Sequence, residues 1–232
     1  MNLASWWSQG DGVTHLVAFL LLVMSVLSWV LMVFKLRQLH AGTRQVSAAL
    51  DLFWRAPDME TARQHVAAVD AQRLLLPLLD SAQALQSNTL ASAGEPASQL
   101  TRRLRGALQG VSRRLQWGLA VLASIGSTAP FVGLLGTVWG IFHALMEMGA
   151  STAIGISAEL APLSAMPAMT LDRLAAPVGE ALVMTAAGLV VAIPAVLAYN
   201  LLSRRAADLT AELEGFAHDV SELLMAPARR LG

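Results

Sequence analysis

The sequence predicts an all-α integral membrane protein with three transmembrane helices. Of its 232 residues, 55% are hydrophobic and only 14% are charged, which is too apolar for a soluble domain of this length. Three long apolar runs are separated by segments whose apolar residues recur at steps of three and four, the spacing of an amphipathic helix. No strand pattern competes with this interpretation, so we expect helices both inside and outside the membrane.

Composition and motifs exclude several classes of function. Lys and Arg together number 16, as do Asp and Glu, so there is no basic excess of the kind that nucleic-acid binding requires. The absence of cysteine excludes disulfides, thiolate metal sites and cysteine nucleophiles. The five histidines are scattered, and no phosphate loop, nucleophile elbow or zinc motif occurs. We therefore expect neither an enzyme nor a metal or cofactor site.

The first span is predicted at residues 13–34, after an N-terminal segment of residues 1–12. It contains 22 residues without a formal charge, and as a helix of about 33 Å it would cross a hydrocarbon core of about 30 Å. Positive charges follow this run rather than precede it, so we interpret it as a retained helix and not as a signal peptide. Its large apolar side chains predict an outer wall that faces lipid: Leu16, Phe19, Leu20, Leu22, Leu27, Trp29 and Leu31.

The second and third spans are predicted at residues 117–147 and 176–202, with residues 148–175 connecting them. The positive residues cluster at one end of each span: Lys35, Arg37 and Arg44 after the first, Arg102, Arg103, Arg105, Arg113 and Arg114 before the second, Arg204 and Arg205 after the third. By the positive-inside rule these ends are cytoplasmic. We therefore expect a periplasmic N-terminus, a cytoplasmic helical loop of residues 35–116 and a cytoplasmic tail of residues 203–232.

The cytoplasmic segments carry their own helical stripes. Leu100, Leu104, Leu108, Val111 and Leu115 predict an amphipathic helix that runs directly into the second span, after a linker at residues 87–98. The tail shows a heptad seam that extends the third span into the cytoplasm: Leu202, Ala206, Leu209, Leu213, Phe216, Val220 and Leu223.

Small residues line one face of each of the last two spans. In the second span this face comprises Gly126, Pro130, Gly133, Thr137, Gly140 and Ala144, with Gly136 and Gly140 forming a GxxxG pair, and in the third Gly188, Ala192, Ala195 and Ala198. In lipid such faces allow close packing of helices, so these two spans are expected to form the inner pair of an oligomer. Pro130 and Pro194 each predict a kink. Ser124, Ser127 and Thr128 either bond the backbone near Pro130 or touch a polar pathway.

Polar side chains are few within these two spans, and three of them are candidate site residues. Glu180 lies about one turn into the third span, where it is either an interfacial residue at the helix start or a carboxylate in a hydrated cavity between subunits. Thr185 lies about 140° further around the helix, and Thr137 is the matching hydroxyl of the second span. Each threonine either bonds its own backbone or contributes to a polar collar. No Asp or Glu lies near mid-depth, so a partner would have to supply a central acid for proton transfer.

Two segments resemble the signature of the MotA/TolQ/ExbB proton-channel family, closest to ExbB and TolQ. These are ASIGSTAPFVGLLGTVWGIFHAL (residues 123–145) and APVGEALVMTAAGLVVAIPAVLAYN (residues 176–200), and the three-span topology agrees with the family along the whole chain. The resemblance implies a subunit of the bacterial inner membrane that forms a pentameric ring around the helices of an ExbD-like or TolR-like partner. A membrane Asp of this single-span partner would be the central acid.

The resemblance also implies roles for residues and for the complex. Glu180, Thr185 and Thr137 match the polar channel residues of the family, and Pro130 and Pro194 match family positions. Such a complex uses the proton gradient to energise TonB for transport across the outer membrane, or TolA in the Tol-Pal system. A scaffold that only holds its partner and a channel that works alone remain the alternatives. This chain departs from the family in a longer outer connection, and it has three spans where MotA has four.

Overall fold

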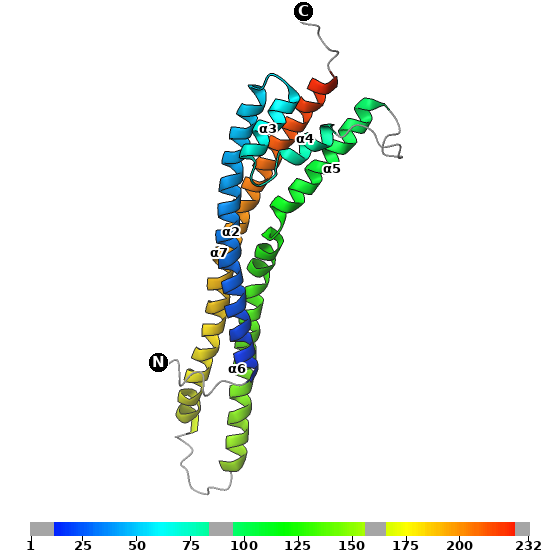
Figure 1. The fold of residues 1–232 in the computed structure, drawn as a ribbon. Helices are drawn as coiled ribbons and strands as arrows, with labels where there is room; N and C mark the ends of the chain where they lie inside the picture. The colour runs from blue at the N-terminus through cyan, green and yellow to red at the C-terminus, as the bar shows by residue number, and fades with distance from the viewer. Residues whose placement is uncertain (1–11, 84–94, 156–165, 226–232) are drawn as a thin grey trace, which may run out of the picture. The chain divides into compact units, whose positions relative to one another are not determined.

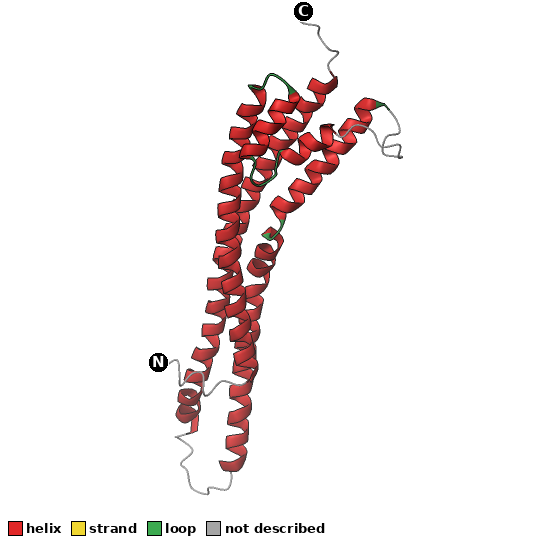
Figure 2. Ribbon diagram, viewed as in Figure 1, coloured by secondary structure: helices red, strands yellow, loops and turns green. Residues whose placement is uncertain are grey.

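The computed structural model describes residues 12–83, 95–155 and 166–225, with the side chains of all of these except 147–155, 166–177 and Glu180. All regular structure in these ranges is α-helix (Figures 1 and 2). The helices are α2 (Gly12–Trp54), α3 (Met59–Val69), α4 (Leu76–Gln83), α5 (Pro96–Gln116), α6 (Leu119–Gly155) and α7 (Met166–Met225). Three stretches, within residues 12–54, 96–146 and 181–225, are long and apolar enough to cross a membrane. The predicted helical fold with three spans is confirmed for the described residues.

The chain divides into two compact units. The membrane unit lies within Met1–Met32 and Val121–Tyr199, and the extramembrane unit within Val33–Ala120 and Asn200–Gly232. Helices α2 and α7 contribute to both units, because each continues beyond its apolar run without a break.

The core of the membrane unit is formed by one stripe from each of three helices. Val17 and Leu21 of α2 are buried with Ala129 of α6 and with Met184 and Ala192 of α7. The prediction that α2 only faces lipid was therefore wrong in part. Leu31, expected on the lipid face, is 8% exposed, while Phe19 is 60% exposed. A helix that packs against two others buries one side of its surface, and residues 17, 21, 28 and 31 lie on that side.

The extramembrane unit buries the stripes that its sequence periodicity predicts. Leu202, Ala206, Leu209, Leu213, Phe216 and Val220 of α7 are all buried, which confirms the seam as far as Val220, whereas Leu223 is exposed. On α5, Leu100, Leu104, Val111 and Leu115 are buried and Leu108 is half-buried. Phe53 near the end of α2 packs edge to face on Phe216, with ring centroids 4.9 Å apart.

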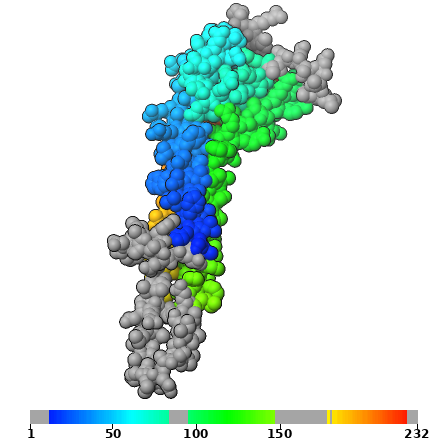
Figure 3. Space-filling model, turned by 60° about the horizontal axis from the view of Figure 1, so that its bottom comes forward, coloured from blue at the N-terminus to red at the C-terminus, as the bar shows by residue number. Residues whose placement is uncertain are grey.

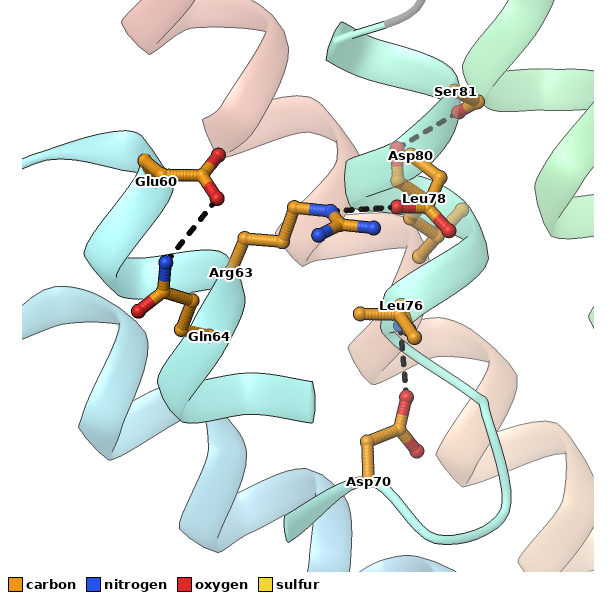
Figure 4. A network of polar contacts seen from close by, with 8 residues as sticks. All are labelled: Glu60, Arg63, Gln64, Asp70, Leu76, Leu78, Asp80 and Ser81. Carbon is orange, nitrogen blue, oxygen red and sulfur yellow. Dashed lines mark hydrogen bonds and ion pairs between the residues drawn. The ribbon is translucent and has the colours of Figure 1, made fainter. Parts of the chain in front are cut away.

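Polar contacts fix the short helices of this unit. The buried Asp70 carboxylate accepts hydrogen bonds from the backbone N–H groups of Leu74, Leu75 and Leu76, each at 2.8 Å, so it satisfies donors at the start of α4. Figure 4 shows the bond to Leu76. Arg63 of α3 forms an ion pair with Asp80 of α4 at 2.8 Å. Helix α4 in turn packs against α5 (Figures 1 and 3).

The predicted continuous helix from the α5 stripe into the second span was wrong. Helix α5 ends at Gln116, Gly118 adopts a φ of 82°, and α6 begins at Leu119. A left-handed residue ends an α-helix, and glycine adopts this conformation without the cost that a Cβ imposes. The buried Lys35 ammonium donates to the carbonyls of Arg114 and Leu115, both at 3.2 Å, and thereby satisfies two acceptors at the end of α5.

Other expected boundaries fall near or outside the described residues. Helix α5 begins at Pro96, inside the linker predicted at residues 87–98, of which residues 87–94 lie outside the described part. The backbone of the predicted outer connection is helical over residues 148–155 and 166–175, since α6 ends at Gly155 and α7 begins at Met166.

Candidate functional site

Helices α6 and α7 approach each other at their glycines. An ideal Cβ added to Gly133 would lie 2.6 Å from the Met184 carbonyl oxygen, and one added to Gly188 would lie 2.6 Å from the Ala129 carbonyl oxygen. Only the absence of a side chain allows each backbone to pass this close to the other. The faces predicted to be small are thus the contact surface of the two spans within one chain.

The other glycines of α6 divide between two neighbours. Gly126 faces Val196 of α7, and Gly140 faces Ala181 of the same helix. Gly136 instead meets Val17 of α2 as well as Met184, so the GxxxG pair does not form one contact with one helix. Among these glycines of α6, Gly136 is therefore the one that also contacts α2.

This packing brings the two predicted threonines together. The Thr185 hydroxyl of α7 donates to the Thr137 hydroxyl of α6 at 3.5 Å, which is long for a hydrogen bond between hydroxyls. Thr137 donates in turn to the Leu134 carbonyl at 2.7 Å. Thr137 is 5% exposed, whereas Thr185 is half-buried. Thr137 therefore bonds its own backbone and also meets the other hydroxyl, and the polar collar stays a prediction.

The direction of the hydrogen bonds decides which of the two hydroxyls can accept a further hydrogen bond. Thr137 has used its proton on the Leu134 carbonyl, so it acts toward Thr185 only as an acceptor. Thr185 keeps its lone pairs for a further donor, such as water or a protonated carboxyl group. Of the pair, Thr185 is the side chain that an incoming proton donor can reach.

Glu180, the third predicted site residue, lies in α7 five positions before Thr185. Its carboxylate is not among the described side chains, so its role stays a prediction. The next residue, Ala181, is buried, and its Cβ lies 3.3 Å from the position that a Cβ on Gly140 would take. The backbone of this turn therefore packs against α6.

Both prolines lie within helices, where the kinks stay a prediction, and nearby hydroxyls bond the local backbone. Pro130 lies inside α6 and Pro194 inside α7, both half-buried. Pro130 leaves the carbonyl of residue 126 without its usual donor. Ser127 and Thr128 instead both donate to the Ser124 carbonyl, at 3.1 and 2.7 Å. These hydroxyls do bond the local backbone, but not at the carbonyl that the proline frees.

Sequence reasoning missed two residues that shape this region and its surroundings. Met184 meets both Gly133 and Gly136 and belongs to the buried core. Lys35 was used only to orient the first span, yet its ammonium is fully buried and bound to α5. A lysine directly after an apolar run was the available signal, but its partners lie 79 and 80 positions away in the chain.

The part of the chain that contains these contacts matches a known protein family. The model of the MotA/TolQ/ExbB proton channel family matches residues 77–215, which include Thr137, Glu180 and Thr185. This chain belongs to that family. The resemblance inferred from the two span segments is thereby confirmed.

Similarity to individual members extends over nearly the full chain. Biopolymer transport protein ExbB of Neisseria meningitidis serogroup A is 41% identical over 236 residues, covering 97% of this chain and 98% of the relative. ExbB of Xanthomonas campestris pv. campestris strain B100 is 38% identical, covering 96% and 86%. Tol-Pal system protein TolQ of Pseudomonas aeruginosa is 29% identical, covering 95% and 92%. The chain is an ExbB-like member of a membrane protein family whose named relatives are transport-system proteins.

Proposed function

We propose that this chain is the channel subunit of an inner-membrane complex that uses the proton gradient to power TonB-dependent transport across the outer membrane. The observation that carries the proposal is the Thr137–Thr185 contact between two apolar spans of a chain in a proton channel family. Identity of 41% with an ExbB, against 29% with a TolQ, favours the TonB system over the Tol-Pal system.

In this proposal the chain forms a pentameric ring around a single-span partner of the ExbD type. Protons enter from the periplasmic side near Glu180, pass to a membrane Asp of the partner, and leave past Thr185 toward the cytoplasm. Thr137 holds Thr185 in place by accepting its hydrogen bond, so its own role is positioning. One proton that crosses 100 mV releases about 2.3 kcal/mol, and several would suffice to move the partner within the ring.

The test measures proton flux into liposomes that contain the chain with its co-purified partner. Glu180→Gln should abolish flux, because an amide cannot release a proton. Thr185→Val should lower it about tenfold, the effect of about 1.4 kcal/mol on the barrier of the pathway. Thr128→Val is the matched control, since it removes the same group from α6 where the hydroxyl only bonds its own backbone.

Three results would contradict the proposal. Full flux in both Glu180→Gln and Thr185→Val would remove these residues from the pathway. No flux in the native complex, with assembly intact, would favour a scaffold that only holds its partner. Flux without any partner would instead identify a channel that works alone.

A further inference from the structure

We propose that a basic cavity between α2 and α7 binds the phosphodiester headgroup of an anionic phospholipid. The basic cavity has a volume of about 640 Å³ and is lined by Leu36, Arg37, His40, Ala41, Arg44, Gln45 and Arg205. Three of these residues are arginines from two helices, and because the lining surface is mostly apolar they line the cavity largely with their hydrocarbon stems. This proposal requires only that the chain is inserted in a membrane, and it does not depend on proton conduction by the chain.

The arginines of the basic cavity have no partner within the described part of the chain. The side chains of Arg37, Arg44 and Arg205 are exposed, and none of them makes a hydrogen bond or ion pair there. Arginine offers a planar fork of donors that matches phosphate oxygens. A cluster of unpaired guanidinium groups is therefore a site for an oxyanion.

The nearest carboxylates lie at the far end of the site. Asp208 and Glu212 of α7 line an adjoining cavity together with His40, Arg44 and Arg205. Asp208 is six positions beyond Leu202, whereas Arg205 is only three, so the acids lie further along α7 from the third span. Arg37 lines the basic cavity but not the adjoining one, so it is the arginine of the site that shares no cavity with these two acids.

The basic cavity lies at headgroup depth along both helices. Arg37 follows Phe34, the last residue of the predicted first span, by three positions, and Arg205 follows Leu202, the last of the predicted third span, by the same number. At 1.5 Å per residue these arginines are about 4.5 Å beyond the apolar runs, where lipid phosphates lie. Basic pockets beside transmembrane helices on the cytoplasmic side are typical sites for anionic headgroups.

Apolar surface continues from the basic cavity toward the span. Leu36, which lines the cavity, is 41% exposed, and Val33 and Phe34 just before it on α2 are 45% and 53% exposed. Such a surface contacts the acyl chains of a lipid whose phosphate is bound by the arginines. A free phosphate ion would use only the charges, so the combination of charge and apolar surface favours a phospholipid.

The experiment measures equilibrium binding of short-chain phosphatidylglycerol and phosphatidylcholine to the purified full chain in neutral detergent. We expect phosphatidylglycerol to bind at least about tenfold more tightly, since each arginine near the headgroup contributes on the order of one tenfold step or less. The variant R37Q/R205Q should lose this preference. The control R55Q/R105Q removes two exposed arginines away from the basic cavity, one directly after α2 and one in α5, and should keep the preference.

Any of the following outcomes would contradict the proposal. Equal binding of the two lipids, or an unchanged preference in R37Q/R205Q, would show that the arginines do not select the headgroup. Complete displacement of the lipid by inorganic phosphate would identify an anion site without a lipid. A change of oligomeric state in R37Q/R205Q, with no lipid preference in the native chain, would identify the surface as a contact with a second copy. Circular dichroism of both variants verifies that they fold.

Discussion

Two pairs of glycines, one pair in each unit of this chain, have different surroundings. In the membrane unit, Gly133 and Gly188 lie where any side chain would collide with a carbonyl oxygen of the facing helix. In the extramembrane unit, a Cβ on Gly106 or Gly110 of α5 would meet nothing within 4 Å. Here the helices are joined by buried leucines and by Phe53 against Phe216. The same substitution should therefore have opposite consequences at these two pairs of positions.

The units also differ in buried charge, because Lys35 and Asp70, the buried charged side chains of the described residues, both belong to the extramembrane unit. Asp70 binds backbone N–H groups at the start of α4, and Lys35 binds carbonyl groups at the end of α5. In the membrane unit, the hydroxyls of Ser127, Thr128 and Thr137 bond carbonyls of their own helical turn. Burial of apolar surface drives association in water but not between helices in lipid. The lipid-embedded pair therefore depends on close contact, and the other unit on core volume and helix caps.

The largest expected effect comes from Gly133→Leu. Its side chain would separate α6 from α7, because the backbone of Met184 and Gly188 already occupies the space. We expect a loss of more than about 3 kcal/mol of stability, the upper range for an overpacked core. Thermal unfolding in detergent, followed by circular dichroism, measures the change.

Gly106→Leu is the matched control for this prediction. It faces open space on α5, and leucine is the better helix former by several tenths of a kcal/mol, so stability should stay the same or rise slightly. Similar losses in both variants would contradict the distinction between the two units.

A smaller loss is expected from Asp70→Ala. Three backbone N–H groups of Leu74, Leu75 and Leu76 would lose their common acceptor in a buried position. Each unsatisfied buried donor costs about 1 kcal/mol or more, so the unit should lose about 3 kcal/mol. Asp80→Ala is the control, since it removes only a partly exposed ion pair with Arg63 and should cost less than about 1 kcal/mol. Equal melting temperatures for the two variants would be evidence against the capping role of Asp70.

Lys35→Met should have a moderate effect. Methionine fills a similar volume but cannot donate to the Arg114 and Leu115 carbonyls. The variant also removes a buried charge, which offsets part of the loss, so we expect about 1.5 kcal/mol of destabilisation. Faster hydrogen exchange at the end of α5 would locate the effect. Arg113→Met removes an exposed cation from the same turn, and it should leave exchange there unchanged.

Periodicity explains which of these features could be predicted from the sequence. Leu202 to Val220 could be assigned to a buried seam because burial on a helix repeats every three or four residues. The face of small residues around Gly133 could also be predicted from the sequence. The rotation of α6 against α7, which puts Thr137 beside Thr185 and Gly136 beside Val17, depends on contacts between distant segments. Single residues such as Gly118 and Lys35 carry no periodic signal, so the helix break and its cap were missed.

The smallest effect concerns the exposed cap of α3. The backbone N–H of Thr61 donates to the Asp58 carboxylate at 2.8 Å, and this hydrogen bond, with that of the Thr61 hydroxyl, lowers the pKa of Asp58 below its ordinary value. Because the pKa is lower in the folded state, the charged cap stabilises the unit above the unfolded pKa of about 3.9. That contribution is lost as the pH falls through the folded pKa. Asp58→Asn keeps a capping oxygen without the charge. The melting temperatures of the native chain and this variant should therefore differ slightly at pH 6 and converge below pH 4, and a difference that stays constant across this range would contradict the assignment.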